Sequence, residues 1–208
     1  FEEVNMEVPV LTICGPHWIR GYLEEYSWFS RHELKFTFAH NSLIQDKKNE
    51  MSDYFATEFG LTCFQAISVF HCRDAFGCYL KSNAGWSLAF SGDCRPTEQF
   101  IKECQDVTLL IHESTMTDKD VELAIQKNHS ATSEALEVGR MMRAEYTILT
   151  HFSQRQSTFP VRDFGSNTTP LNTIIAFDLM SIQASRVALF PKIIPVVRSV
   201  YDALHETE

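Results

Sequence analysis

Apolar and polar positions along the chain change period repeatedly, from the alternation typical of strands to the three-and-four spacing typical of helices. Short apolar runs bounded by turn residues predict strands at residues 8–13, 34–40, 66–71, 77–82, 86–90, 107–111, 146–150 and 174–182. Helical spacing predicts helices at residues 18–28, 97–104, 118–126, 133–142 and 190–204, with polar loops at residues 45–50 and 156–173. Strands that alternate with helices predict a layered α/β fold.

Four of the expected strands end at, or just before, a residue that binds metal ions or transfers protons. These residues are His71, Asp93, the pair His112-Glu113, and His151. In layered α/β folds, strand ends bring side chains from distant parts of the chain to one place. Imidazole and carboxylate together suit zinc or a similar divalent ion. Each residue alone is more often an ordinary surface or turn residue, but their repetition favours a metal site.

Composition narrows the classes of protein. With 208 residues, 44% of them hydrophobic, the chain can bury one good core. The six cysteines form no Cys-x-x-Cys pair, which favours a reduced, intracellular protein and argues against a zinc finger. No apolar run reaches the roughly 18 residues that span a bilayer, so we expect no membrane partner.

The net charge of −9 argues against a broad basic surface that would gather nucleic acid by counterion release. It is compatible with a compact site in which metal ions supply the positive charge. The charge therefore does not exclude nucleic-acid chemistry at a local, metal-assisted site.

Five short motifs occur in a fixed order along the chain. They are VFHCRDAFG at residues 69–77, FSGDCRP at 90–96, LLIHEST at 109–115, KNHSATSEALEVG at 127–139 and ILTHFSQR at 148–155. In this order and at these spacings they resemble the tRNase Z family, endoribonucleases that remove 3′ trailers from precursor tRNA and belong to the metallo-β-lactamase superfamily. The resemblance is dense from residue 61 to residue 155, and residues 174–182 with the expected helix after them are similar to the end of the long form.

The resemblance implies a fold and a metal site. The fold would be α/β, part of a four-layer αβ/βα sandwich with two zinc ions between its sheets. It implies that His71 binds one zinc, that His151 binds the other and that Asp93 bridges them. The ions would stabilise charge on the attacking and leaving oxygens of the phosphodiester.

The resemblance also implies an acid–base pair. Glu113 would hold His129, which would donate a proton to the departing 3′ oxygen of the tRNA. Arg95 and Arg155 each follow a site residue closely and could contact phosphate. The expected substrate is precursor tRNA, and the expected location is intracellular, in the nucleus, the mitochondrion or both.

One family motif is missing. His-x-His-x-Asp-His normally precedes this region, and the chain contains no His-x-His. Without it each zinc would keep two protein ligands, fewer than catalytic zinc usually has. Because the sequence begins at Phe1, we expect residues 1–208 to be a single truncated domain that is inactive alone. Its partner would be the N-terminal half of the parent protein, with the missing motif and the arm that grips tRNA.

Two other functions remain open at this stage. The chain could be a non-catalytic binding or scaffolding module of the same fold, although such a module has no chemical reason to keep all five site residues. It could also be another metal-dependent hydrolase of the superfamily, acting on an ester, a thioester or a small phosphodiester. Metal content and substrate preference separate these functions.

Overall fold

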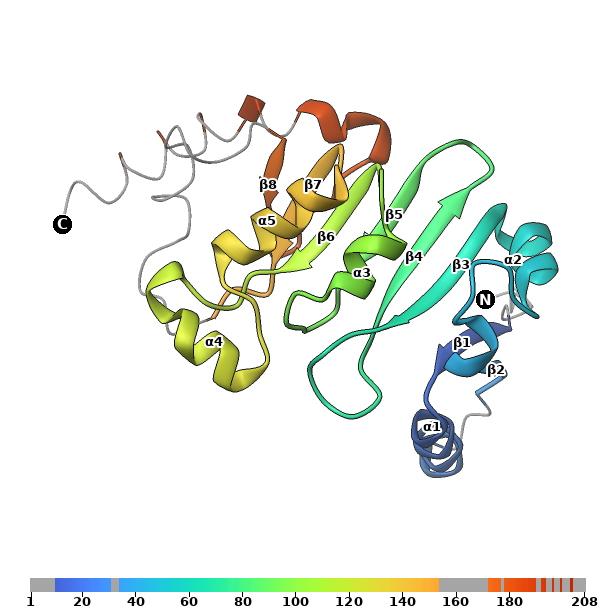
Figure 1. The fold of residues 1–208 in the computed structure, drawn as a ribbon. Coiled ribbons are helices and arrows are strands. Elements are labelled where there is room, and N and C mark those ends of the chain that lie inside the picture. The colour runs from blue at the N-terminus through green and yellow to red at the C-terminus, as the bar shows by residue number, and fades with distance from the viewer. Residues whose placement is uncertain are drawn as a thin grey trace, which may run out of the picture.

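The computed structural model describes residues 10–30, 34–153, 172–176 and 178–189, with a few single positions beyond them. Its main feature is a six-stranded mixed sheet in the order β3-β4-β5-β6-β7-β8, beside a two-stranded parallel sheet of β1 and β2 (Figure 1). The strands are β1 (Leu11–Gly15), β2 (Phe36–His40), β3 (Leu61–Ser68), β4 (Phe76–Ser82), β5 (Ser87–Phe90), β6 (Leu109–Glu113), β7 (Tyr146–Thr150) and β8 (Thr173–Ile175). This confirms the α/β fold class.

Helices flank the strands in the expected alternation. The α-helices are α1 (His17–Ser30), α2 (Ser52–Phe59), α3 (Glu98–Glu103), α4 (Val121–Lys127) and α5 (Thr132–Met142). Short 3₁₀ helices are η1 (Asn41–Ile44), η2 (Asp118–Asp120) and η4 (Ala184–Leu189). Among the described residues no helix has both the length and the apolar content needed to cross a bilayer.

The directions of the strands bring the carboxyl ends of several strands to one edge of the sheet. β3, β4 and β5 pair antiparallel, and β5, β6, β7 and β8 pair parallel. β3 therefore runs in the same direction as β5, β6 and β7, and the carboxyl ends of these four strands lie at the same edge. In parallel sheets this edge is where ligands bind.

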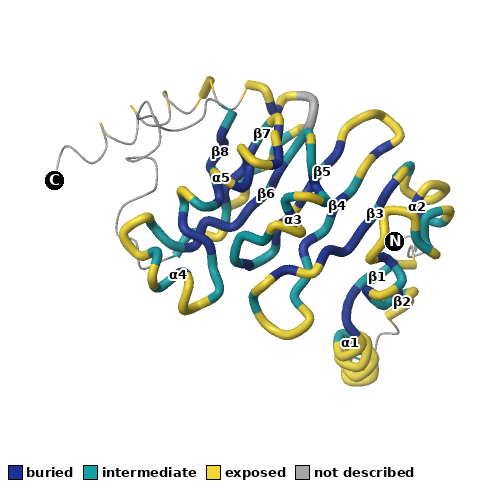
Figure 2. Tube along the Cα trace, in the orientation of Figure 1, coloured by how far each residue is buried: buried dark blue, intermediate teal, exposed yellow. Residues whose placement is uncertain are grey.

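The main core lies between the sheet and helices α3 and α5. Phe100 of α3 and Val138 and Met142 of α5 pack with Leu110 of β6 in one buried cluster. One face of β6 and β7 is buried under the helices, and the other is only partly covered, by Met180, Ile182 and Val187. Contacts on both faces explain the nearly continuous apolar sequences of these strands. Figure 2 shows buried positions along the strands and exposed positions on the outer helices.

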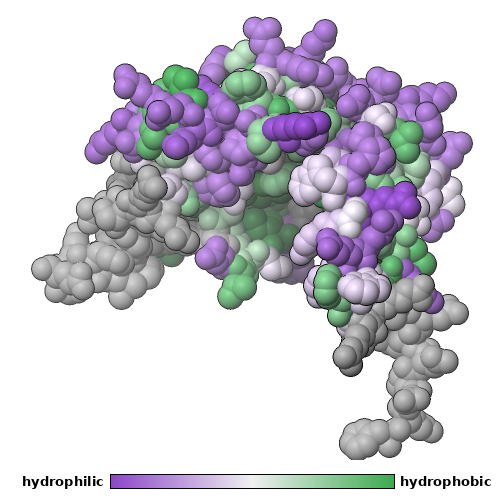
Figure 3. Space-filling model, turned by 90° about the horizontal axis from the view of Figure 1, so that it is seen from below, coloured by the Kyte–Doolittle hydropathy of each residue, from purple (hydrophilic) through white to green (hydrophobic). Residues whose placement is uncertain are grey.

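An apolar groove of about 810 Å³ lies on sheet strands β5, β6 and β7, with the segment after β8. Its lining includes Trp86, Leu88, Leu109, Ile111, Ile148, Ala176, Met180, Ile182 and Val187. Figure 3 shows apolar side chains gathered in a hollow of the surface. Helix α1 also exposes large aromatic side chains, with Trp18, Trp28 and Phe29 at 65%, 78% and 69% exposure. Apolar surface of this extent is typical of an interface.

Some expected elements differ from the observed ones. The expected strand at residues 66–71 begins and ends earlier, as β3 (Leu61–Ser68). Pairing with β4 extends over its whole length, including residues 61–65, whose own pattern is mixed, and it stops at Ser68. Helix α2 was not expected at all. The long strand expected at residues 174–182 is only β8 (Thr173–Ile175), and a turn at Asp178 and Leu179 follows it. The loop at 156–173 and the helix at 190–204 lie largely outside the described residues.

Candidate active site

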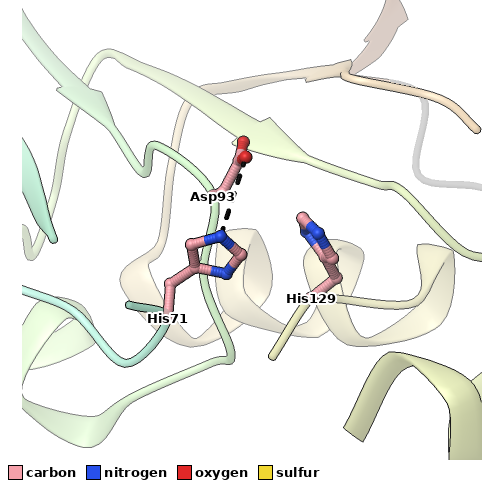
Figure 4. Close-up of side chains that lie close together, drawn as sticks. All are labelled: His71, Asp93 and His129. Atoms are coloured by element: carbon pink, nitrogen blue, oxygen red, sulfur yellow. Dashed lines mark ion pairs between the residues drawn. The ribbon is translucent and has the colours of Figure 1, made fainter. Parts of the chain in front are cut away.

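The predicted metal and acid–base residues come together at the carboxyl ends of the strands. Glu113 is the last residue of β6, and His151 follows β7 directly. Asp93 lies in the turn after β5, and His71 lies in the loop after β3. His129 lies in the short loop between α4 and α5. Figure 4 shows the side chains of His71, Asp93 and His129 close together, with His71 directed at Asp93.

The two outer histidines approach the two oxygens of one carboxylate. His71 Nε2 is 4.0 Å from Asp93 Oδ2, and His151 Nε2 is 3.6 Å from Asp93 Oδ1. Both distances are too long for a hydrogen bond. They are close to the roughly 3.3–3.6 Å that separates two ligand atoms of one tetrahedral zinc ion. The donor set therefore fits a zinc-type metal at the carboxylate of Asp93.

A backbone carbonyl orients the ring of His71. Its Nδ1 lies 2.9 Å from the backbone carbonyl oxygen of Asn128, and the side-chain Nδ2 of Asn128 donates back to the His71 carbonyl at 2.8 Å. Because a carbonyl only accepts hydrogen bonds, Nδ1 carries the hydrogen and Nε2 offers its lone pair toward Asp93. A metal-binding histidine is oriented in this way when its second nitrogen binds a fixed acceptor.

Glu113 is buried, with 2% of its side chain exposed. It accepts hydrogen bonds from the backbone N–H groups of Cys94 (2.7 Å), Thr115 (3.2 Å) and Ser130 (3.1 Å), from the Thr115 hydroxyl (2.5 Å) and from His129 Nδ1 (2.8 Å). Burial raises the pKa of Glu113, but these hydrogen bonds outweigh burial and bring the pKa below its ordinary value. Glu113 is therefore a carboxylate at neutral pH.

The carboxylate of Glu113 determines which nitrogen of His129 is available. Since Glu113 Oε1 only accepts, His129 Nδ1 carries a hydrogen and Nε2 is left to give or take a proton. A fixed carboxylate also stabilises the imidazolium that forms when Nε2 is protonated. With 16% of its side chain exposed, His129 keeps some contact with solvent. The pair has the arrangement of a general acid held by a carboxylate.

His151 has an uncommon backbone conformation. Its φ angle is +60°, in the left-handed region that few residues other than glycine adopt. This turn follows the end of β7, and the chain stays beside the segment after β6, since the Ser153 N–H donates to the Thr115 carbonyl at 3.1 Å. Strained backbone of this kind is often kept at functional positions.

Arg95 holds the loop that carries His129. One of its terminal nitrogens donates to the His129 carbonyl and to Glu134 Oε2, each at 2.7 Å, and the other binds Glu134 Oε1. Glu134 Oε2 also accepts from the backbone N–H of Ala131 at 2.9 Å. These are the observed contacts of Arg95, and its contact with phosphate stays a prediction. Arg155 lies outside the described residues.

Two residues that complete the site were not predicted from the sequence. Thr115 contacts Glu113, His129 and His151, and Asn128 contacts His71. The only signal for Thr115 is its place two positions after Glu113, which puts both on the same side of an extended chain. Asparagine at the end of a helix predicts the left-handed turn seen at Asn128, but not its contact with His71.

The chain is similar to several known proteins, although no protein-family model matches it. It is 38% identical over 188 residues to "Ribonuclease Z 1" of Schizosaccharomyces pombe, covering 86% of this chain and 23% of that protein. It is 33% identical over 203 residues to "Zinc phosphodiesterase ELAC protein 2" of Pan troglodytes, covering 92% and 24%. It is 37% identical over 163 residues to "tRNase Z TRZ3, mitochondrial" of Arabidopsis thaliana, covering 73% and 18%.

Solved structures share the fold. The crystal structure of a long form RNase Z from yeast matches 95% of this chain and 31% of its own, with a TM-score of 0.80 and 21% identity. The metallo-β-lactamase fold protein YhfI from Bacillus subtilis matches 84% of this chain and 65% of its own, with a TM-score of 0.61 and 15% identity. The described residues therefore form part of a metallo-β-lactamase fold.

Within that class, the sequence relatives are more specific. The chain is tRNase Z-like, and the structure that it matches over 95% of its length is that of a long form. The chain spans about a quarter of the length of the Schizosaccharomyces pombe and Pan troglodytes relatives. The resemblance read from the five motifs is confirmed, and with it the expectation of a zinc-type metal site.

Proposed function

We propose that the complete protein carrying this chain is a zinc-dependent endoribonuclease that removes the 3′ trailer from precursor tRNA. The observation that carries this proposal is the Glu113–His129 pair held beside the His71, Asp93 and His151 side chains. A metal site with a separate proton donor is what cleavage of a phosphodiester with a poor leaving group requires. The names of the sequence relatives support tRNA as the substrate.

The residues of the chain divide the work between metal binding and proton transfer. His71 and His151 would each hold one of two zinc ions, and Asp93 would be shared between them. When bound, the ions would neutralise charge on the phosphate and assist the attack of water on phosphorus. As the bond between phosphorus and the 3′ oxygen breaks, His129 Nε2 gives its proton to that oxygen. The products are a tRNA with a 3′-hydroxyl and a trailer with a 5′-phosphate.

The remaining zinc ligands would come from the N-terminal half of the parent protein. We propose that residues 1–208 form the C-terminal part of one truncated domain and that the missing part covers the apolar groove and the aromatic surface of α1. The volume and apolar lining of the groove and the exposure of the α1 aromatic residues support this proposal. A location in the mitochondrion, the nucleus or both belongs to the same proposal, and the name of the Arabidopsis relative supports the first.

The proposal is tested by incubating the complete protein with a precursor tRNA, with zinc and after chelation. Cleavage at the 3′ side that depends on zinc is expected, with the 5′-phosphate on the trailer. Absence of cleavage by a protein that contains stoichiometric zinc would contradict it. A scaffolding module should purify without zinc, and another hydrolase of the superfamily should turn over a small chromogenic phosphodiester but leave the precursor tRNA intact.

The kinetics of Arg95→Lys separate two uses of Arg95. Lysine keeps the charge but loses the paired contact with Glu134, so the His129 loop should move. We expect kcat to fall by up to about 100-fold with little change in KM, because the proton donor is misplaced.

A rise in KM without loss of kcat would instead mean that Arg95 binds substrate phosphate. Arg140→Lys is the matched control, since Arg140 forms an equivalent paired contact with Glu137 on the exposed surface. Its kinetic constants should equal those of the natural protein.

A further inference from the structure

Thr115 lies at the centre of the site, two residues beyond the end of β6, with only 7% of the residue exposed. Its hydroxyl oxygen is 2.5 Å from Glu113 Oε2 and 2.7 Å from His151 Nδ1. It is also 3.3 Å from His129 Nδ1. One side chain therefore touches the carboxylate, the proton donor and a metal ligand.

The direction of these hydrogen bonds follows from the number of hydrogens. The hydroxyl has one hydrogen to give, and the carboxylate of Glu113 can only accept, so Thr115 donates to Glu113 Oε2. Its oxygen must then accept from His151, which requires a hydrogen on His151 Nδ1. The lone pair of His151 is left on Nε2, the atom that faces Asp93 Oδ1 at 3.6 Å.

The two predicted histidine ligands are thus oriented differently. His71 is held by a backbone carbonyl, which no substitution can remove. His151 is held by a side-chain hydroxyl, which is itself held by the carboxylate of the acid–base pair. The hydrogen bonds form a continuous path from His151 through Thr115 and Glu113 to His129, and bonds in such a path strengthen one another.

We infer that Thr115 is a positioning residue that selects the metal-binding tautomer of His151 and ties this ligand to the Glu113–His129 pair. The inference rests on the proposed function for its meaning in catalysis. Its consequence is that the metal site and the proton donor are coupled through one hydroxyl. Removing that hydroxyl should weaken both functions at once.

The experiment compares Thr115→Val, Thr115→Ser and Thr115→Ala in the complete protein by zinc affinity and by precursor-tRNA cleavage. Valine keeps the volume but loses the hydroxyl, and zinc affinity should fall by about 10–100-fold, with kcat falling as well. Serine keeps the hydroxyl and should restore zinc affinity to within a few-fold of the natural protein. A residue that only fills space would give the opposite order, since serine loses a buried methyl group and valine does not.

Thr132→Val is the matched control. Its hydroxyl is hydrogen-bonded to Ser114 Oγ at 2.9 Å and to the Met116 carbonyl at 3.3 Å, and these partners are outside the proposed metal and proton-transfer groups. Zinc affinity and kcat should stay close to natural values in this variant. If Thr115→Val does not fold, serine against alanine still isolates the hydroxyl, because the two side chains differ in that group alone.

Equal zinc affinity in the natural protein and in Thr115→Val, or in serine and alanine, would overturn the inference. If the natural protein binds zinc but leaves precursor tRNA intact, the proposed function falls, and the zinc affinities of the variants still decide the role of Thr115. A natural protein that binds no zinc would overturn both.

Discussion

Asp93→Ala is expected to lose zinc and precursor-tRNA cleavage together. The two carboxylate oxygens of Asp93 face His71 Nε2 and His151 Nε2, so the substitution removes a ligand from both sides of the site. Removing a residue that only orients a metal ligand typically costs about 10–100-fold in metal affinity, and the loss of zinc affinity here should be larger. Metal content after dialysis and the cleavage rate with saturating zinc measure the two effects.

Asp74→Asn is a suitable control for this prediction, because Asp74 has a φ angle of +58° and asparagine accepts this left-handed backbone better than alanine does. Asp74 lies on the loop that follows His71, and its carboxylate pairs with the exposed Arg73. Its removal changes the local charge as Asp93→Ala does, without removing a predicted ligand. Retention of full zinc content by Asp93→Ala would show that this carboxylate does not bind the metal, and the proposed site would have to be rebuilt around other ligands.

His129→Ala is expected to slow cleavage by about 10²–10⁴-fold while zinc stays bound. His129 Nδ1 is bound to Glu113, and the proton on Nε2 is lost with the ring. The leaving 3′ oxygen must then depart without a proton from the protein. Single-turnover cleavage and metal content are measured on the same preparation.

Zinc content decides whether His129 is a metal ligand or a proton donor. Its ligand atoms also lie within 4.8 Å of those of His71 and Asp93, so the geometry allows it to bind metal. Loss of zinc in His129→Ala to the same degree as in Asp93→Ala would make His129 a ligand or a structural residue. Retained zinc with slow chemistry supports its role as the proton donor.

The strand ends could be predicted from the sequence because they depend on local pattern. Strand β7 has the bounds that the sequence predicts, and helix α5 begins within one residue of its predicted start. A run of apolar residues that ends in a polar one marks the edge of a sheet wherever that sheet lies. His151 and the pair His112-Glu113 could be chosen as candidates for that reason alone, whereas the choice of Glu113 within the pair came from the family resemblance.

Contacts between distant segments could not be predicted in this way. The position of Arg95 close after Asp93 predicts a contact with substrate phosphate. Its observed partner Glu134 is 39 positions away, and only the fold brings the two side chains together. The same holds for Thr115, whose hydroxyl gains its importance from His151, 36 positions later. Local sequence indicates which residues can do chemistry, and tertiary structure determines which of them are already engaged.

The left-handed backbone at His151 also limits how this position can change as related sequences diverge. Glycine, asparagine, aspartate and histidine enter this conformation most easily, whereas other residues lose about 1–2 kcal/mol. Of these four, only histidine offers a neutral ring nitrogen to a metal ion. Histidine therefore satisfies both the backbone at this position and the proposed ligand role, and aspartate is the one substitute that would keep the backbone and still offer a metal-binding atom. In a diverging sequence, any other residue here would indicate that the proposed metal site has been given up.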